Sequence, residues 1–198
     1  LAEGLRPLYT RPLLRAVAGS SMIYLFFSSV MLAVYVLYAT REVGLSPASL
    51  GLVYGVGGVG AVLGASLSVR VTHRLGLGPT MIGANLAGGL AMLLVPLADT
   101  AASVTTATWL LSAAQGTSGL MGAVFYVNQT SLLQAAAPEH LLGRMVASHR
   151  FLTMGVVPIG SLVGGLLGEV IGLQTTLLVG ALGMLLPTVW LWFSPLRV

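Results

Sequence analysis

The stretch GRMVASHRFLTMGVVPIGSLVGGLLG, from Gly143 to Gly168, decides the fold of this chain. After Arg144 and Arg150 it runs without charge over residues 151–168, which as a helix measures about 27 Å. A hydrocarbon core is about 30 Å thick. An interior proline and a glycine at every fourth position destabilise a helix in water, whereas in a membrane they permit a kink and the close approach of another helix. The stretch therefore predicts a transmembrane helix, with packing and bending assigned to Gly155, Pro158, Gly160, Gly164 and Gly168.

The composition excludes several classes of protein. The chain has 198 residues, of which 56% are hydrophobic and 7% charged, against about 25% charged residues in soluble domains. The net charge of +4 comes from arginines, and because long apolar runs separate them, we expect no nucleic-acid partner. The absence of cysteine excludes disulfides and thiol chemistry. The lipid bilayer is the expected surrounding.

Charged and turn residues divide the chain into apolar segments. After a cytoplasmic linker at 1–15, residues 16–198 are expected to form a six-helix transmembrane bundle. The uncharged run 100–138 is about twice one span in length, but it holds no strong turn signal, so we expect one long helix there. The expected helices are about 16–40, 48–69, 79–97, 102–137, 144–168 and 174–193.

The arginines set the orientation of this bundle. With six spans, one side holds Arg6, Arg11, Arg15, Arg70, Arg74, Arg144, Arg150 and Arg197, and the other holds Arg41. Because positive residues favour the cytoplasmic side, both ends of the chain are expected there, in a multi-pass protein of the cell (inner) membrane. Arg70 and Arg74 are expected in a basic turn after the second helix.

Glycines concentrate in the second and fifth helices, which occupy the same position in two successive three-helix units. The second helix holds Gly51, Gly55 and Gly64 among others. This distribution favours a 3+3 inverted repeat, as in some transporters. The expected fold is an all-α membrane protein with six transmembrane helices in that repeat.

Polar and aromatic residues on two helices are candidates for a substrate cavity. Tyr24, Ser28, Met31, Tyr35 and Tyr38 fall on one face of the first helix, where they line either a cavity or a contact between helices. Intramembrane amides face the bundle interior, so Gln115, Asn128 and Gln129 bind either substrate or a neighbouring helix.

Other polar residues have weaker assignments. Arg70, Arg74, Arg144 and Arg150 are candidates for a cytoplasmic gate or loop, although long arginine side chains also reach the headgroups without such a role. His73, His140 and His149 are placed at the cytoplasmic edge, and their spacing matches no metal site or catalytic pair. We expect no catalytic residue, no metal and no cofactor.

Three stretches carry a resemblance to a known family. They are EGLRPLYTRPLLRAVAG (Glu3 to Gly19), GASLSVRVTHRLG (Gly64 to Gly76) and PEHLLGRMVASHRFLTMGVVPIGSLVGGLLG (Pro138 to Gly168). With them the chain resembles the C-terminal six-helix half of a major facilitator superfamily transporter. It is similar to the drug:proton antiporter branch that includes macrolide efflux proteins and the enterobactin exporter. One departure is Ser68, near the place where the superfamily's loop signature has an Asp.

The resemblance implies two six-helix bundles with a midplane substrate cavity and alternating access. The partners it implies are the N-terminal half of the same chain, a small-molecule substrate and protons. It also implies that the second and fifth helices face the other bundle, which would explain their glycines. Because no acid of this chain lies at mid-membrane, the coupling carboxylate is expected in the N-terminal half.

The leading hypothesis is export of amphipathic small molecules such as drugs or siderophores. A metabolite or sugar importer of the same superfamily is the alternative, and a non-transporting membrane scaffold or truncated remnant is an alternative of another class. A membrane enzyme is disfavoured, because no nucleophile–base pair is apparent. Since the chain starts at Leu1 rather than Met, we expect it to be a piece of a longer polypeptide.

Overall fold

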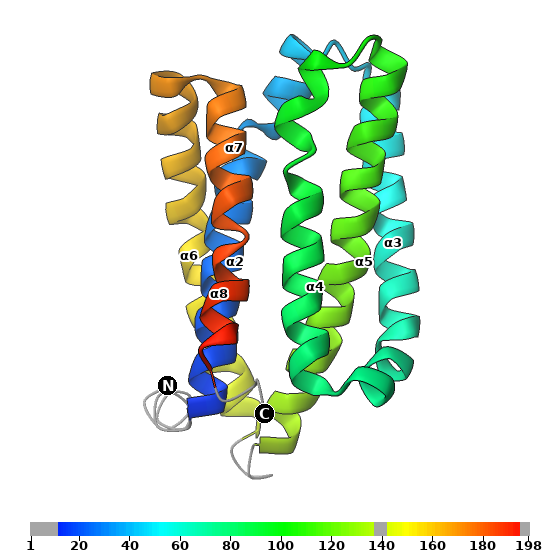
Figure 1. Ribbon diagram of the computed structural model, residues 1–198. Coiled ribbons are helices and arrows are strands. Elements are labelled where there is room, and N and C mark those ends of the chain that lie inside the picture. Colours follow the sequence, from blue (N-terminus) through cyan, green and yellow to red (C-terminus); the bar gives the residue numbers. More distant parts are fainter. Residues whose placement is uncertain (1–11, 137–141, 195–198) are drawn as a thin grey trace.

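A computed structural model describes residues 12–136 and 142–194 of the chain. In this part, six helical segments are long and apolar enough to cross a membrane, and the described residues contain no strand. The segments run up and down in a bundle (Figure 1). The helical elements, in chain order, are α2 (Pro12–Leu37), η1 (Tyr38–Glu42), α3 (Pro47–Leu75), α4 (Leu77–Met92), η2 (Val95–Thr100), α5 (Val104–Ala136), α6 (Leu142–Ile171), α7 (Leu173–Gly183) and α8 (Leu186–Trp192).

The helices pack as two related three-helix units. In the first unit, the middle helix α3 leaves α2 and packs along α5, while α4 also packs on α5. In the second unit, the middle helix α6 packs along α2, and α7 and α8 also pack on α2. Figure 1 accordingly shows α3, α4 and α5 together on one side and α2, α6, α7 and α8 on the other. The exchange of middle helices is the arrangement of an inverted repeat, and the six-helix all-α prediction is confirmed.

Several observed boundaries differ from the expected ones. α2 begins at Pro12, inside the expected linker, since proline is well tolerated in the first turn of a helix. α3 continues to Leu75, so Arg70 and Arg74 lie in its last turns and not in a basic turn. The turn itself is at Gly76, whose φ of 84° favours glycine.

Prolines interrupt the α-helix near the C-terminal end of the third span and in the middle of the last span. Near Pro96 the third span changes from α4 to the short 3-10 helix η2. The last span is two helices, α7 and α8, joined at Met184–Leu185 shortly before Pro187. Because a proline ring clashes with the carbonyl four residues earlier, a continuous helix through this point is disfavoured. By contrast, α6 continues through Pro158 from Leu142 to Ile171.

Glycines form two contacts between helix backbones. In the first, the α3–α5 seam, a Cβ atom added at Gly60 or Gly64 would meet the carbonyl oxygen of Gly116 or Leu120. In the second, the α6–α2 seam, Gly160 and Gly164 face the α2 backbone in the same way. A Cβ atom added at Gly168 would instead meet the side chain of Val34. These glycines therefore pack within the chain, and the expectation that a second bundle explains them is wrong for these positions.

Three of the glycines expected to pack make no close contact within the described residues of this chain, so their packing stays a prediction. A Cβ atom added at Gly51, Gly55 or Gly155 would meet nothing within 4 Å. The reason is helical phase. Gly51 and Gly55 lie on a different face of α3 from Gly60 and Gly64, and Gly155 lies on a different face of α6 from the seam glycines.

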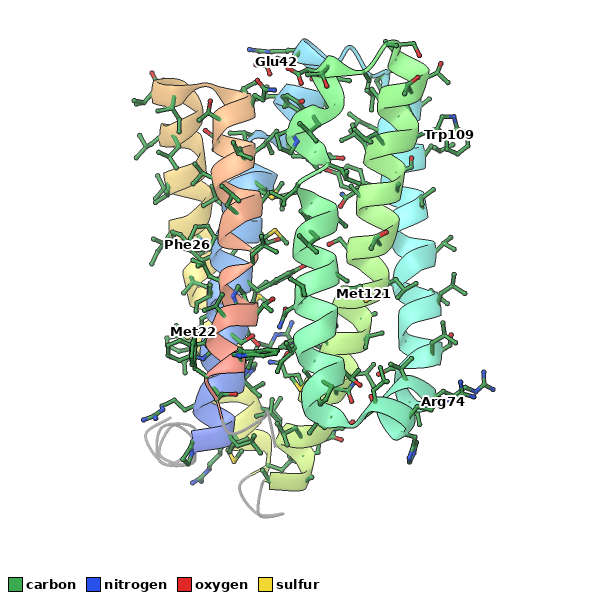
Figure 2. All side chains as sticks on the ribbon, in the orientation of Figure 1. Met22, Phe26, Glu42, Arg74, Trp109 and Met121 are labelled. Atoms are coloured by element: carbon green, nitrogen blue, oxygen red, sulfur yellow. The ribbon has the colours of Figure 1, made fainter. Side chains whose placement is uncertain are left out.

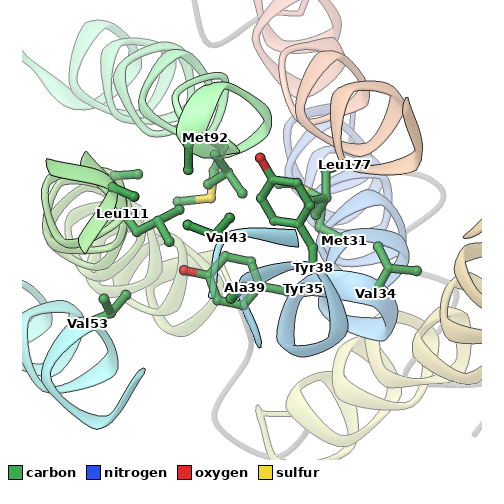
Figure 3. Close-up of a cluster of buried hydrophobic side chains, with 14 of the residues drawn as sticks. Met31, Val34, Tyr35, Tyr38, Ala39, Val43, Val53, Met92, Leu111 and Leu177 are labelled. Atoms are coloured by element: carbon green, nitrogen blue, oxygen red, sulfur yellow. The ribbon is translucent and has the colours of Figure 1, made fainter. Parts of the chain in front are cut away.

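The largest buried cluster lies at the end of the bundle away from the α2 start. Its centre is formed by Tyr35 and Tyr38, whose rings extend toward Leu111 and Met92 (Figure 3). The Tyr38 hydroxyl accepts a hydrogen bond from the backbone N–H of Asp99 at 3.1 Å. The Gln174 amide donates to Asp99 Oδ1 at 3.0 Å, which ties the start of α7 to η2. This end is thus closed by packing.

Charged side chains separate to the two ends of the bundle. Figure 2 shows Arg74 near the end where α2 starts and Glu42 at the opposite end. Asp99 and Glu169 lie at the same end as Glu42, in the last residues of η2 and α6. The described carboxylates are therefore separated from the basic end by the whole apolar bundle.

Candidate functional site

A cavity of about 370 Å³ lies in the half of the bundle nearest the basic end, among α2, α4, α5 and α6. It exists because α5 and α6 make little contact with each other while each packs on a different neighbour. The described residues that line it are Ser21, Tyr24, Leu25, Ala84, Asn85, Gly88, Met121, Gly122, Phe125, Tyr126, Gln129, Thr130, Leu133, Val146, His149, Arg150, Thr153 and Met154.

A chain of hydrogen bonds forms one wall of this cavity and joins α2, α5 and α6. The Ser21 hydroxyl donates its proton to the carbonyl of Val17 at 2.9 Å. Its oxygen must then accept, and the Gln129 amide donates to it at 2.9 Å. The same Gln129 nitrogen lies 2.8 Å from His149 Nε2.

The proton positions follow from this geometry. Since the Gln129 NH₂ group only donates, His149 Nε2 accepts, and the ring carries its proton on Nδ1. Gln129 is 6% exposed and His149 8% exposed. Buried amides and imidazoles need such partners, because a missing hydrogen bond there is costly. The wall is therefore a fixed polar feature inside an apolar bundle.

The rest of the lining is more apolar. Met121 lies between α4 and α5 (Figure 2) and lines the cavity together with Leu25 and Phe125. Asn85 of α4 adds an amide, which donates to the Ser20 hydroxyl at 3.4 Å. Tyr126 is 67% exposed and places a phenol at the edge. A ligand in this space would meet apolar, aromatic and hydrogen-bonding groups together.

A second cavity of about 100 Å³ lies farther along the bundle and shares Tyr24 with the first. Tyr24 and Ser118 both line this smaller cavity. Tyr35 and Tyr54 face each other with ring centroids 5.8 Å apart. The buried Tyr35 hydroxyl has no hydrogen-bond partner among the described residues. The lining residues are Tyr24, Ser28, Met31, Leu32, Tyr35, Tyr54, Met92, Gln115, Ser118 and Met184.

The structure brings most of the candidate cavity residues together. Tyr24, Ser28, Met31, Tyr35 and Gln115 line the smaller cavity, and Gln129 lines the larger one. Their binding of substrate stays a prediction.

Asn128 does not belong to either cavity, contrary to the prediction. It lies in the α3–α5 seam, where its amide donates to Ser68 Oγ at 3.0 Å and accepts from Thr72 Oγ1 at 2.8 Å. One helical step from Gln129, about 100° around the axis, turns its side chain toward α3.

The four candidate gate arginines separate into two kinds. Arg150 lines the larger cavity, and its side chain is exposed at the cavity's opening. Arg70 and Arg74 are exposed near the end of α3, and Arg144 is exposed in the first turn of α6. A gating role for any of them stays a prediction.

Sequence reasoning missed many cavity residues, among them Tyr54, Asn85, Tyr126 and His149. A signal for His149 was present, because Met145, Ser148, His149 and Thr153 are buried on one stripe of α6. Such spacing marks the packed face of a helix. Assigning His149 to the membrane edge overlooked that stripe. Within the described residues, no group of three or more His, Cys, Asp or Glu side chains is placed to hold a metal ion.

Comparisons with known proteins agree with the fold. The family model described as Major Facilitator Superfamily matches residues 17–198. The multidrug efflux pump Tap of Mycolicibacterium fortuitum is 28% identical over 199 aligned positions, covering 98% of this chain and 46% of that protein. The chain thus spans about half the length of this relative. No solved structure gives a significant match.

Proposed function

The chain belongs to the major facilitator superfamily, and we propose that it forms the C-terminal six-helix half of a secondary exporter for amphipathic small molecules. Proteins of this superfamily are carriers rather than enzymes. The observation that carries the proposal is the cavity of about 370 Å³ among α2, α4, α5 and α6. A drug-sized site typically combines apolar walls with a few placed polar groups, and this cavity has both.

The export direction and chemistry rest on three supports. The similar multidrug efflux pump is one. The cavity's position near the arginine-rich end is the second, because this end is proposed to be cytoplasmic by the positive-inside rule. The third is the mixture of phenol, thioether and amide groups, which suits varied partly apolar ligands. We place the protein in the cell (inner) membrane with both ends of this segment cytoplasmic.

Alternating access requires a second bundle against which this one moves. The proposed companion is an N-terminal six-helix half, in keeping with a relative about twice as long. The glycines with open space, Gly51, Gly55 and Gly155, offer flat surfaces to it. The described acids Glu42, Asp99 and Glu169 lie at the end opposite the arginine-rich one. We therefore assign proton coupling to a carboxylate within the first six helices of the full-length chain.

A cavity-filling variant tests export. At Gly122, a Cβ atom would meet only the Tyr24 hydroxyl oxygen, at 3.9 Å, so a larger side chain there extends into the cavity. When cells that lack the gene are given the full-length protein, export lowers their dye accumulation. Gly122→Trp is expected to abolish this effect. The matched control is Gly83→Trp on α4, where an added Cβ meets nothing within 4 Å.

The readout distinguishes the alternatives. Normal export by Gly122→Trp, with both variants present in the membrane at equal amounts, would contradict a substrate path through this cavity. Unchanged accumulation of every compound on deleting the gene would exclude export altogether. Gene-dependent uptake of a sugar or metabolite would favour the importer.

A further inference from the structure

We propose that the larger cavity selects organic anions, with Arg150 as the residue that binds the acidic group. This inference deepens the proposed transport function and rests on it for the substrate's passage, but its central claim is about binding. It concerns molecules with an apolar or aromatic body and one carboxylate or similarly acidic group.

The charge balance of the cavity carries the proposal. Arg150 is the only described lining residue with a permanent charge, and no Asp or Glu is among them. Across residues 12–136 and 142–194, no carboxylate lies within ion-pair distance of its guanidinium, and no hydrogen bond of that side chain is found. The described acids are toward the far end of the bundle. The cavity therefore holds a positive charge without a protein counter-ion.

The position of Arg150 makes this charge effective. It lies eight residues after Leu142, about 12 Å along the helix at about 1.5 Å per residue. The cavity walls are largely apolar there, with Leu25, Met121 and Phe125 among them. In surroundings of intermediate polarity a charge pair interacts roughly fourfold more strongly than in bulk water. A guanidinium also binds carboxylates through two parallel hydrogen bonds.

The neighbouring His149 adds a donor and no negative charge. Its Nε2 is occupied by Gln129, which leaves the proton on Nδ1, and this N–H has no hydrogen-bond partner among the described residues. Tyr126 and Asn85 supply further neutral polar groups on the lining. The polar lining can thus donate to an acidic oxygen, while the apolar wall accommodates the rest of the ligand.

Three dyes with one fluorophore test this selectivity by direct binding to the natural full-length protein in detergent. Dansylglycine is an anion, dansylamide is neutral and dansylcadaverine is a cation at neutral pH. We expect dansylglycine to bind most tightly. Arg150→Gln should weaken dansylglycine binding by about tenfold or more, as for the loss of one charge-assisted hydrogen-bonding group, and leave dansylamide within about twofold.

Two further variants make the result specific. Arg150→Lys keeps the charge and should retain the preference for the anion over the neutral dye, with some affinity lost because a lysine does not bind bidentately. Arg15→Gln removes an exposed charge in the first turns of α2, at the same end but outside the cavity, and should leave all three affinities unchanged.

Several outcomes would overturn the proposal. One is equal or tighter binding of the cationic dye by the unmodified protein. Another is unchanged dansylglycine affinity in Arg150→Gln. If the melting temperature of that variant is also lowered, Arg150 is assigned to an ion pair with a companion bundle. If Arg150→Gln does not fold, the ranking of the dyes in the unmodified protein and in Arg150→Lys still decides.

A transport measurement separates this inference from the proposed function. Proteoliposomes that bind dansylglycine through Arg150 but move no dye would contradict export and leave the anion site standing. Export of the cationic and neutral dyes with no anion binding would support export and overturn the anion site.

Discussion

The two glycine seams occupy equivalent places, since each joins the middle helix of one three-helix unit to the first helix of the other, yet they are built differently. In the α3–α5 seam both helices contribute glycine: Gly60 faces Gly116, and Gly119 faces the carbonyl oxygen of Gly57. In the α6–α2 seam only α6 does, and Gly160 and Gly164 face backbone atoms of Phe26 and Val30. The difference teaches that one glycine-bearing helix is enough for backbone contact when the partner turns its carbonyl groups toward it.

The two seams also differ in the hydrogen bonds that cross them. The α3–α5 seam carries Asn128, which bridges to Ser68 and Thr72. In the α6–α2 seam the Ser29 hydroxyl, which lies beside Gly160, bonds to its own helix at Leu25. Hydrogen bonds between transmembrane helices contribute about 1 kcal/mol each on average or less. The first seam therefore combines close packing with a polar clamp, whereas the second relies on packing.

The largest effect is expected for Gly64→Ala in the α3–α5 seam. Its new Cβ atom would meet the backbone of Leu120, which cannot rotate aside as a side chain can, and separating the helices would also strain the Asn128 bonds. Overpacking of this kind costs about 1–3 kcal/mol. Gly164→Ala, which meets Val30, should cost about 1 kcal/mol less because no clamp is broken. The free energy of unfolding in mixed micelles measures both. An equal or larger loss for Gly164→Ala would remove the distinction between the seams.

A smaller effect is expected for Asn128→Leu. The substitution leaves Thr72 and Ser68 without the amide and should lower the free energy of unfolding by about 1 kcal/mol. Because Asn128 lies outside both cavities, the affinity for a bound dye should be unchanged. Thr108→Val on the same helix is the control, since that partly exposed hydroxyl bonds to the backbone carbonyl of Val104 and lines neither cavity. If Asn128→Leu loses dye affinity while its stability is unchanged, Asn128 belongs to the binding site and not to the seam.

The sequence was sufficient for the number of spans and for much of one cavity wall. Span number follows from the lengths of the apolar runs and, for residues 100–138, from the lack of a turn signal. The Tyr24–Tyr35 stripe follows from helical periodicity within one element. What could not be derived was which face of one helix meets which other helix. Asn128 and Gln129 are adjacent amides, and only the exchange of α3 and α6 between units sends one into a seam and the other into a cavity.

The smallest effect on stability is expected for the glycines outside both seams. Gly55→Ala and Gly155→Ala add a Cβ atom in open space, and alanine favours a helix over glycine by about 1 kcal/mol in water. Neither variant should unfold this bundle more easily, and a slight gain is expected. If a companion bundle packs on these faces, the same substitutions in the full-length protein should nevertheless reduce transport. Exposure to lipid alone would leave transport intact, because a methyl group is readily accommodated by acyl chains. Stability and transport measured on the same variants thus distinguish a face that contacts lipid from a face that contacts protein. Seam variants cannot make this distinction, because they destabilise the bundle in either case.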